Sequence, residues 1–169
     1  RVKSLAGALA EGIKEYVALV HGDFPDEEMT VDWPLGQDGE SNVVKKRRAW
    51  PGGTEPAVTR FRKVLSVGGI SLVRCFPETG RLHQIRAHLE SKGFPIVGDK
   101  LYGRDPAAFL EFVRHGMTAD LQKSLILPRS ALHAARLAFT HPETRRPMNI
   151  RAPLPRLFAD FIRSLRVRD

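Results

Sequence analysis

One stretch is denser in polar and charged side chains than any other: Glu78-Thr-Gly-Arg-Leu-His-Gln-Ile-Arg-Ala-His-Leu89. It holds two arginines, two histidines and a glutamine, and it is followed by Gly93-Phe-Pro-Ile-Val-Gly-Asp-Lys-Leu-Tyr-Gly103. The apolar spacing of residues 82–92 is that of a helix. Gly93 and Pro95 would end this helix in the usual order. We therefore expect one short helix to carry most of the polar groups of a site.

On a helical wheel, Leu82, Ile85 and Leu89 form the core side of this helix, and Arg86 lies at the edge of that side. A cation placed there needs a carboxylate or phosphate partner, because an unpaired buried charge is costly. Glu90, four residues later, is one candidate partner. We expect Arg86 either to point into an open gap or to be paired with a substitute partner such as Glu90.

The start of the helix suggests anion binding. Backbone N–H groups near Gly80, with Arg81 in the first turn, would suit a phosphate; the alternative is an entry turn with one solvated arginine. His83 and His88 are five residues apart, whereas helical metal ligands are three or four apart. We therefore expect no metal site, and each histidine should bond within the fold or contact RNA.

The rest of the chain predicts one α+β domain, with a mixed, mostly antiparallel sheet flanked by helices. Residues 14–20 and 132–139 have the composition of strands, and residues 155–165 that of a terminal amphipathic helix. Residues 57–65 alternate in polarity, and Gly68-Gly69 forms a turn to residues 70–76, which predicts a hairpin. The hydrophobic fraction of 42% is enough for a core.

A formal net charge of +8 favours a polyanionic partner, usually nucleic acid, although a basic surface without such a partner is the alternative. The most basic run is Lys45, Lys46, Arg47 and Arg48, with Trp50 close by. It lies in residues 36–53, which we expect to form a loop or an irregular hairpin. These cations could contact phosphates, or they could be a solvated charge run.

Several classes of protein are disfavoured. No apolar run reaches the roughly 18 residues that a membrane span needs, and no secretion leader is visible. The single cysteine, Cys75, lies in an apolar strand-like run, which favours a buried thiol in a cytoplasmic protein. No phosphate-binding Walker loop, dinucleotide fingerprint or Gly-x-Ser-x-Gly elbow is present.

The central stretch resembles the C-terminal catalytic motif of the RluA-type pseudouridine synthases. The resemblance rests on Thr79-Gly-Arg-Leu-His-Gln-Ile-Arg86, His88, Gly93-Phe-Pro-Ile-Val-Gly-Asp99 and Tyr102-Gly103. Further matches follow in family order: the strand around Tyr16, Ala57-Val-Thr59, Leu132-His-Ala134, Phe139-Thr-His-Pro142 and Ala152-Pro-Leu-Pro155. The resemblance implies isomerisation of uridine to pseudouridine in structured RNA, either ribosomal or transfer RNA, with no metal, organic cofactor, DNA or membrane involved.

Site residues follow from the same resemblance. Arg86 matches the arginine that pairs with the essential aspartate, and Tyr16 matches the tyrosine that lies against the target uracil. That aspartate belongs to a His-Arg-Leu-Asp motif, which is absent from residues 1–169. The chain therefore resembles the C-terminal part of a catalytic domain, which we expect to be inactive by itself. Asp99 should be structural. The expected substrate-binding residues are Arg81, His83, Gln84, Ile85, Lys45, Lys46, Arg47 and Arg48.

Two other functions stay open. A non-catalytic RNA-binding module could have kept the synthase scaffold, and an in-frame His-Arg-Leu-Asp motif upstream in the gene would argue against it. A metal-free hydrolase is a weaker alternative, because the sequence offers no paired nucleophile and base.

Overall fold

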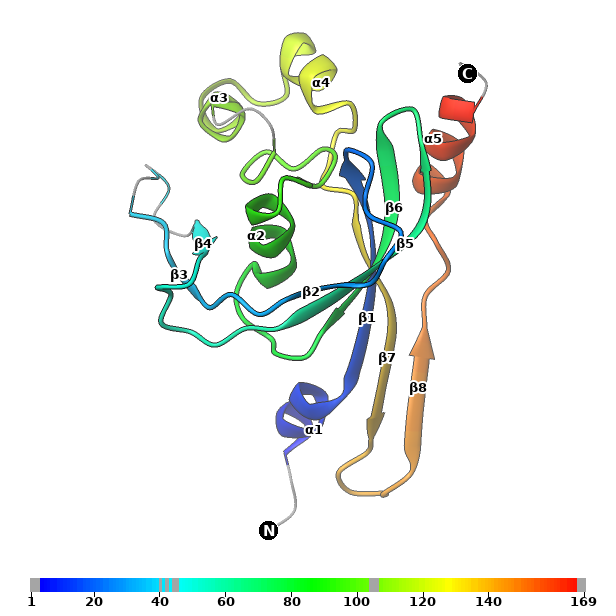
Figure 1. Ribbon diagram of the computed structural model, residues 1–169. Helices are drawn as coiled ribbons and strands as arrows, with labels where there is room; N and C mark the ends of the chain where they lie inside the picture. Colours follow the sequence, from blue (N-terminus) through cyan, green and yellow to red (C-terminus); the bar gives the residue numbers. More distant parts are fainter. Residues whose placement is uncertain (1–3, 40, 42, 44–45, 104–106, 167–169) are drawn as a thin grey trace.

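The computed structural model describes residues 4–39, 41, 43, 46–103 and 107–166. Its main feature is a six-stranded sheet, made of β1 (Ile13–His21), β2 (Met29–Val31), β5 (Thr59–Val67), β6 (Ile70–Pro77), β7 (Leu132–Thr140) and β8 (Pro147–Arg151). The spatial order is β2-β5-β6-β1-β7-β8, and all neighbouring strands are antiparallel (Figure 1). The α+β class predicted from the sequence is confirmed.

Strand β1 lies in the middle of the sheet because it pairs on both sides. Tyr16 is opposite Cys75 of β6 and Ala134 of β7. The β1–β7 register shifts between Glu15 and Tyr16, which is the signature of a bulge. The second half of β1 is buried from Ala18 to His21, so this strand joins the core to the more open end of the sheet.

The hairpin predicted from Gly68-Gly69 is confirmed. Both glycines have positive φ, 55° and 71°, as a two-residue hairpin turn requires. The turn joins β5 to β6 and sets a register in which Phe61 lies opposite Cys75. Both of these side chains are fully buried, in agreement with the buried thiol expected for Cys75.

Helices cover both faces of the sheet. Helix α2 (Gln84–Ser91) contacts β5 and β6 on one side, and α5 (Arg156–Arg166) lies on the other side (Figure 1). Leu165 of α5 lies next to Gly68, and the ring of Phe158 makes an edge contact with His133 of β7. Three other helices are peripheral: α1 (Leu5–Glu11), α3 (Ala108–His115) and α4 (Ala119–Leu125).

One local prediction needs correction. The predicted helix over residues 82–92 begins only at Gln84, because His83 has a left-handed backbone with φ of 58°. Leu82, which we expected in the core, is therefore 56% exposed, and Arg81 lies before the helix and not in its first turn. For residues 36–53 the expected irregular hairpin is found, because the short strands β3 (Leu35–Gln37) and β4 (Arg47–Ala49) pair with one another.

Candidate active site

The turn that enters α2 is held by the side chain of Gln84, which is buried. Its amide nitrogen donates hydrogen bonds to the Val58 carbonyl and the Thr59 hydroxyl, both at 2.9 Å. Its amide oxygen accepts from the Thr79 hydroxyl at 2.7 Å and from the backbone N–H of Arg81 at 3.0 Å. All the bonds of this amide therefore go to the protein, and Gln84 ties β5 to the turn that presents Arg81 and His83.

His83 has a defined partner on its ring. Its Nδ1 lies 3.1 Å from the hydroxyl of Tyr102, and that hydroxyl accepts a bond from the backbone N–H of Arg47 at 2.7 Å. The hydroxyl proton is therefore available to His83 Nδ1. Burial, followed by the charge of Arg86, lowers the pKa of His83. Burial also raises the pKa of Tyr102 to about 12. Both groups are consequently neutral near pH 7.

Arg86 is paired with Asp99, so a carboxylate partner is present as expected, but the partner is not Glu90. Arg86 Nε lies 2.7 Å from one carboxylate oxygen of Asp99, and Nη2 lies 2.8 Å from the other. The Asp99 side chain has no exposed surface, whereas that of Arg86 is 22% exposed. Glu90 instead forms an ion pair with Lys46. The prediction missed this pair because Asp99 comes from the loop after the helix.

The carboxylate of Asp99 is held from several directions. The backbone N–H groups of Leu101 and Tyr102 donate to it at 3.0 and 2.9 Å, and the Ser130 hydroxyl at 3.3 Å. Burial alone would raise the pKa of Asp99, but the hydrogen bonds and charge of Arg86, with the two backbone donors, hold that pKa below its usual range. Asp99 is thus a fixed anion that positions Arg86, and this supports its expected structural role.

Most of the residues predicted to form the site line one open cavity of about 260 Å³. It lies over β1 and β7, with Tyr16, Ile85 and Leu132 as apolar walls. Lys14, Arg81, Arg86, His83 and Gln84 also line it. Six residues named from the sequence therefore meet here: Tyr16, Arg81, His83, Gln84, Ile85 and Arg86. Lys14 and Leu132 were missed, because only the pairing of β1 with β7 brings them together.

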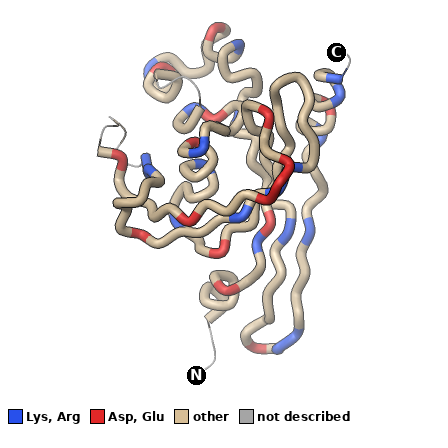
Figure 2. Tube along the Cα trace, in the orientation of Figure 1, with Lys and Arg blue, Asp and Glu red and all other residues tan. Residues whose placement is uncertain are grey.

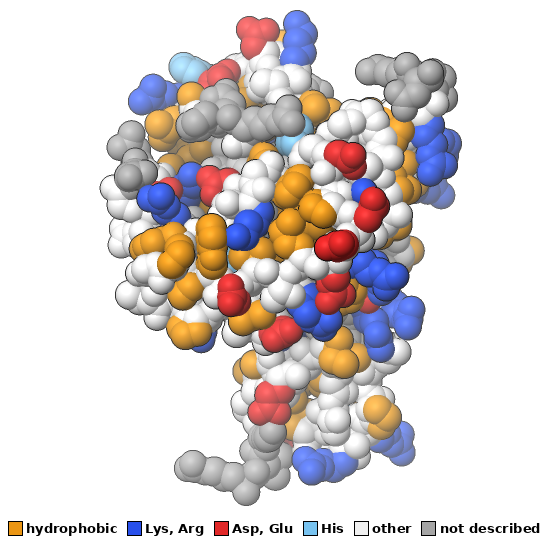
Figure 3. Space-filling view, in the orientation of Figure 1, with side chains coloured by type: hydrophobic (Ala, Val, Ile, Leu, Met, Phe, Trp, Pro, Cys, Tyr) orange, Lys and Arg blue, Asp and Glu red, His pale blue; other side chains and the backbone are white. Residues whose placement is uncertain are grey.

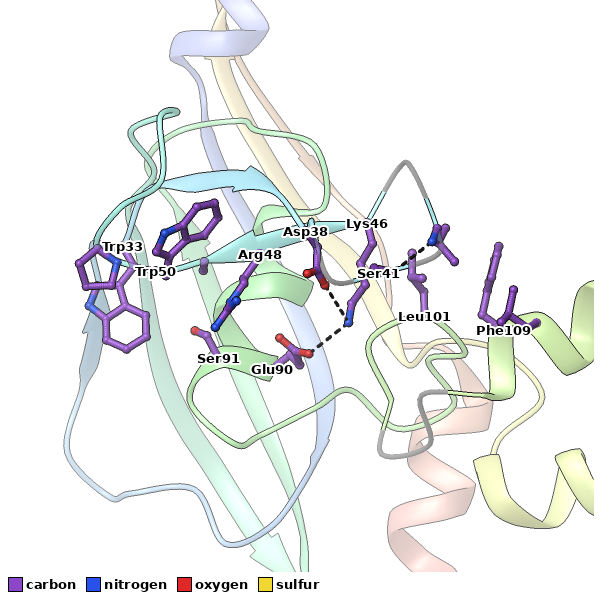
Figure 4. A pocket seen from close by; sticks show the side chains of 14 residues that line it. Trp33, Asp38, Ser41, Lys46, Arg48, Trp50, Glu90, Ser91, Leu101 and Phe109 are labelled. Atoms are coloured by element: carbon purple, nitrogen blue, oxygen red, sulfur yellow. Dashed lines mark hydrogen bonds and ion pairs between the residues drawn. The ribbon is translucent and has the colours of Figure 1, made fainter.

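The basic run is not part of this cavity. Lys45 lies outside the described residues, and Lys46 and Arg48 line a larger cavity of about 730 Å³ (Figure 4). Lys46 bridges Asp38 at 3.3 Å and Glu90 at 3.5 Å. Arg47 forms an ion pair with Glu55, and the guanidinium carbon of Arg48 lies 5.9 Å from the ring centre of Trp50. Most of this charge is therefore engaged within the protein.

Two further searches cover the described part of the chain. Among these residues, no three His, Cys, Asp or Glu side chains are grouped so that they could hold a metal ion. No helix in the same ranges is both long and apolar enough to cross a membrane.

Known proteins match both the sequence and the fold. Residues 11–91 match the family described as RNA pseudouridylate synthase. The chain is 36% identical over 153 residues to the ribosomal large subunit pseudouridine synthase C of Vibrio vulnificus, covering 90% of this chain and 44% of that protein. It is 35% identical over 156 residues to the ribosomal large subunit pseudouridine synthase D of Nitrosomonas europaea, covering 90% and 41%.

Two solved human structures share the fold. Human RNA Pseudouridylate Synthase Domain Containing 4 aligns with a TM-score of 0.68 at 25% identity, covering 93% of this chain and 63% of that one. Human RNA Pseudouridylate Synthase Domain Containing 1 aligns with a TM-score of 0.66 at 22% identity, covering 98% of this chain and 73% of that one. This chain spans less than half of the two bacterial relatives. Sequence and fold agree, and the chain belongs to the RNA pseudouridylate synthase family, among its RluA-type members.

Proposed function

We propose that this chain provides the base-binding part of an enzyme that isomerises specific uridines to pseudouridine in structured RNA, either ribosomal or transfer RNA. The observation that carries the proposal is the convergence of Tyr16 and Arg86 on one open cavity. In the proposed reaction the glycosidic bond breaks, the uracil turns, and it reattaches to the ribose through carbon. The target base must first leave its stack, since its reacting atoms are inaccessible in paired RNA.

Tyr16 is suited to receive the flipped base. It is half-buried on a strand that is paired on both sides, so its ring has a fixed position. A flat aromatic ring can stack on uracil whatever its neighbours in the RNA. Ile85 and Leu132 complete an apolar surface beside the ring. Lys14 and Arg81 at the same cavity can contact the phosphates on either side of the base.

Arg86 retains the capacity to bind a second carboxylate. A guanidinium has five N–H groups, and the bonds to Asp99 use one on Nε and one on Nη2. The remaining donors belong to a side chain that lines the cavity. We propose that they orient the catalytic aspartate of the full enzyme, keeping it ionised and aimed at the sugar. Asp99 is satisfied by its own partners and is not the nucleophile in this proposal.

Release of tritium from RNA labelled at uridine C5 tests the proposal. Residues 1–169 alone should release none, because they contain no His-Arg-Leu-Asp motif. A longer protein from the same gene that includes this motif should release tritium and form pseudouridine without added metal or cofactor. Release by residues 1–169 would contradict the assignment of the nucleophile. A longer protein that binds RNA without turnover would favour the RNA-binding module.

A further inference from the structure

The sheet carries a row of arginines across four of its strands. Arg62 of β5 lies opposite Arg74 of β6, and Arg136 of β7 lies opposite Arg151 of β8. Glu15 of β1 lies opposite Arg136 and forms an ion pair with Arg74 at 2.7 Å, so it joins the two halves of the row. We call Arg62, Arg74, Arg136 and Arg151 the outer arginine row.

The outer arginine row faces away from the cavity. Tyr16 lines the cavity together with residues of α2, and successive side chains of a strand point to opposite faces. Glu15 therefore points to the other face, and residues directly opposite one another share a face. Arg136 lies on the face of Glu15 because the two residues are paired opposite one another. Arg74 lies on that face too, because its side chain contacts Glu15. The row thus lies on the face that α5 covers in part.

This row has an excess of positive charge. Glu15 is the carboxylate that contacts it, and it pairs with Arg74. Arg62 and Arg151 are exposed, and neither has an ion-pair partner among the described residues. Arg136 is bonded to the neutral side chain of Asn149 at 2.9 Å. Among the described residues, a single carboxylate therefore contacts these four guanidinium groups.

The row reaches β8, the last strand of the sheet among the described residues. It extends from β5 to β8, four strand spacings or roughly 19 Å. Strand β8 is exposed along its whole length. Basic residues lie at one level on β7 and β8 in Figure 2, and basic side chains gather along this edge in Figure 3. The cavity lies over β1 and β7, so Tyr16 is two strand spacings, roughly 10 Å, from the same edge.

We infer that the outer arginine row binds phosphates of the RNA substrate after the RNA passes around the β8 edge from the cavity. The inference rests on the proposed function. Exposed, unpaired guanidinium groups on a regular sheet suit phosphates, which they can bind through two hydrogen bonds each. Nucleic-acid interfaces are polar and strongly basic, which is the character of this row.

The geometry makes the contact depend on the size of the RNA. A short stem-loop whose target base occupies the cavity stays on one face of the sheet. An RNA with several helices can continue around β8 and reach the opposite face. The outer arginine row should therefore strengthen binding of large structured RNA and leave the binding of a short stem-loop unchanged.

A charge-matched pair of variants tests this. In Arg62→Gln/Arg151→Gln, the two unpaired members of the row lose their charge and no carboxylate is left unpaired. The control, Arg114→Gln/Arg129→Gln, removes two exposed arginines from α3 and from the segment before β7, which also have no ion-pair partner in the described ranges. Affinities of residues 1–169 for a short stem-loop and for a multi-helix RNA would be measured over a series of salt concentrations.

We expect Arg62→Gln/Arg151→Gln to bind the multi-helix RNA about five- to tenfold more weakly, with a salt slope smaller by about 2. Its affinity for the stem-loop should match that of the control. Equal affinities of the two variants for the multi-helix RNA would overturn this inference alone. Failure of the unmodified chain to bind either RNA would overturn the proposed RNA substrate too. Weaker binding of polyglutamate with unchanged RNA binding would assign the row to an acidic protein and refute the inference.

Discussion

The guanidinium of Arg86 combines two tasks that usually fall to different residues. It neutralises Asp99, a carboxylate without exposed surface, and it presents its remaining donors to the cavity. A planar group with donors along two edges can serve two carboxylates at once, whereas an ammonium is a single point charge. The identity of this residue should therefore matter as much as its charge.

Replacing Arg86 by lysine in a longer, active protein should lower turnover nearly as much as replacing it by alanine. We expect a loss of about 100-fold or more, the usual cost of removing a positioned donor in an active site. Initial rates of tritium release measure the loss, with circular dichroism to confirm folding. Arg114→Lys, on the exposed side of α3, is the matched control and should be unchanged. Near-normal turnover of Arg86→Lys would show that Arg86 does not need to bind two carboxylates at once.

Asp99 should stabilise the fold in a pH-dependent way. Asp99→Asn leaves Arg86 without its anion, and we expect a loss of about 3 kcal/mol in the free energy of unfolding at pH 7. Because the pKa of Asp99 is lowered from 3.8 in the folded state, its contribution is fully present above that value. It is lost as the pH falls through the lower, folded-state pKa.

Urea denaturation of the unmodified protein and of Asp99→Asn, repeated from pH 7 down to the acid range, measures this contribution. The difference between the two proteins should stay constant down to about pH 4 and then shrink. Glu28→Gln is a suitable control, because Glu28 forms only an exposed ion pair with Arg60, worth less than about 1 kcal/mol. A constant difference across the acid range would show that Asp99 does not act through its charge.

Among the elements, α2 is positioned by its first residue. Gln84 bonds to β5 and to the preceding turn with both ends of its amide. In Gln84→Ala the part-buried Val58 carbonyl and the buried Thr59 hydroxyl each lose a donor, and we expect a loss of about 2 kcal/mol in stability. Gln122→Ala, on the exposed side of α4, should change stability by less than about 0.5 kcal/mol. Equal losses of stability for Gln84→Ala and Gln122→Ala in urea denaturation would show that Gln84 does not position α2.

Helix α2 also shows how far local patterns can predict this structure. Its end before Gly93, and Arg86 at the edge of the core, follow from the order of apolar residues. The start does not, because His83 adopts a left-handed conformation that nothing in its sequence neighbourhood requires. The buried position of His88 was not predicted either. Its ring bonds to Thr59 and to the carbonyl of Trp33, and both partners are distant in sequence.

For the molecule as a whole, polarity patterns predicted individual strands and the hairpin of β5 and β6, because these depend on residues close together in sequence. The pairing of β1 with β6 and β7 joins distant segments and was not predicted. The family resemblance predicted that Tyr16 and Arg86 belong to the same site. The partners that hold these residues could not be predicted. Asp99 reaches Arg86 from a separate loop, and Glu90, the partner expected for Arg86, forms an ion pair with Lys46. These pairings depend on the packing of segments whose relative position no local pattern specifies.

The place of β1 between β6 and β7 has a consequence for biosynthesis. Tyr16 leaves the ribosome long before Ala134, its neighbour on β7, and Leu132 of the cavity wall emerges with that late strand. Contacts between such distant segments form slowly, because the intervening loop must first close. Until β7 emerges, β1 has one unpaired edge that is open to mispairing with other chains. The cavity over β1 and β7 is therefore completed late, although Tyr16 is synthesised long before most of the residues around it.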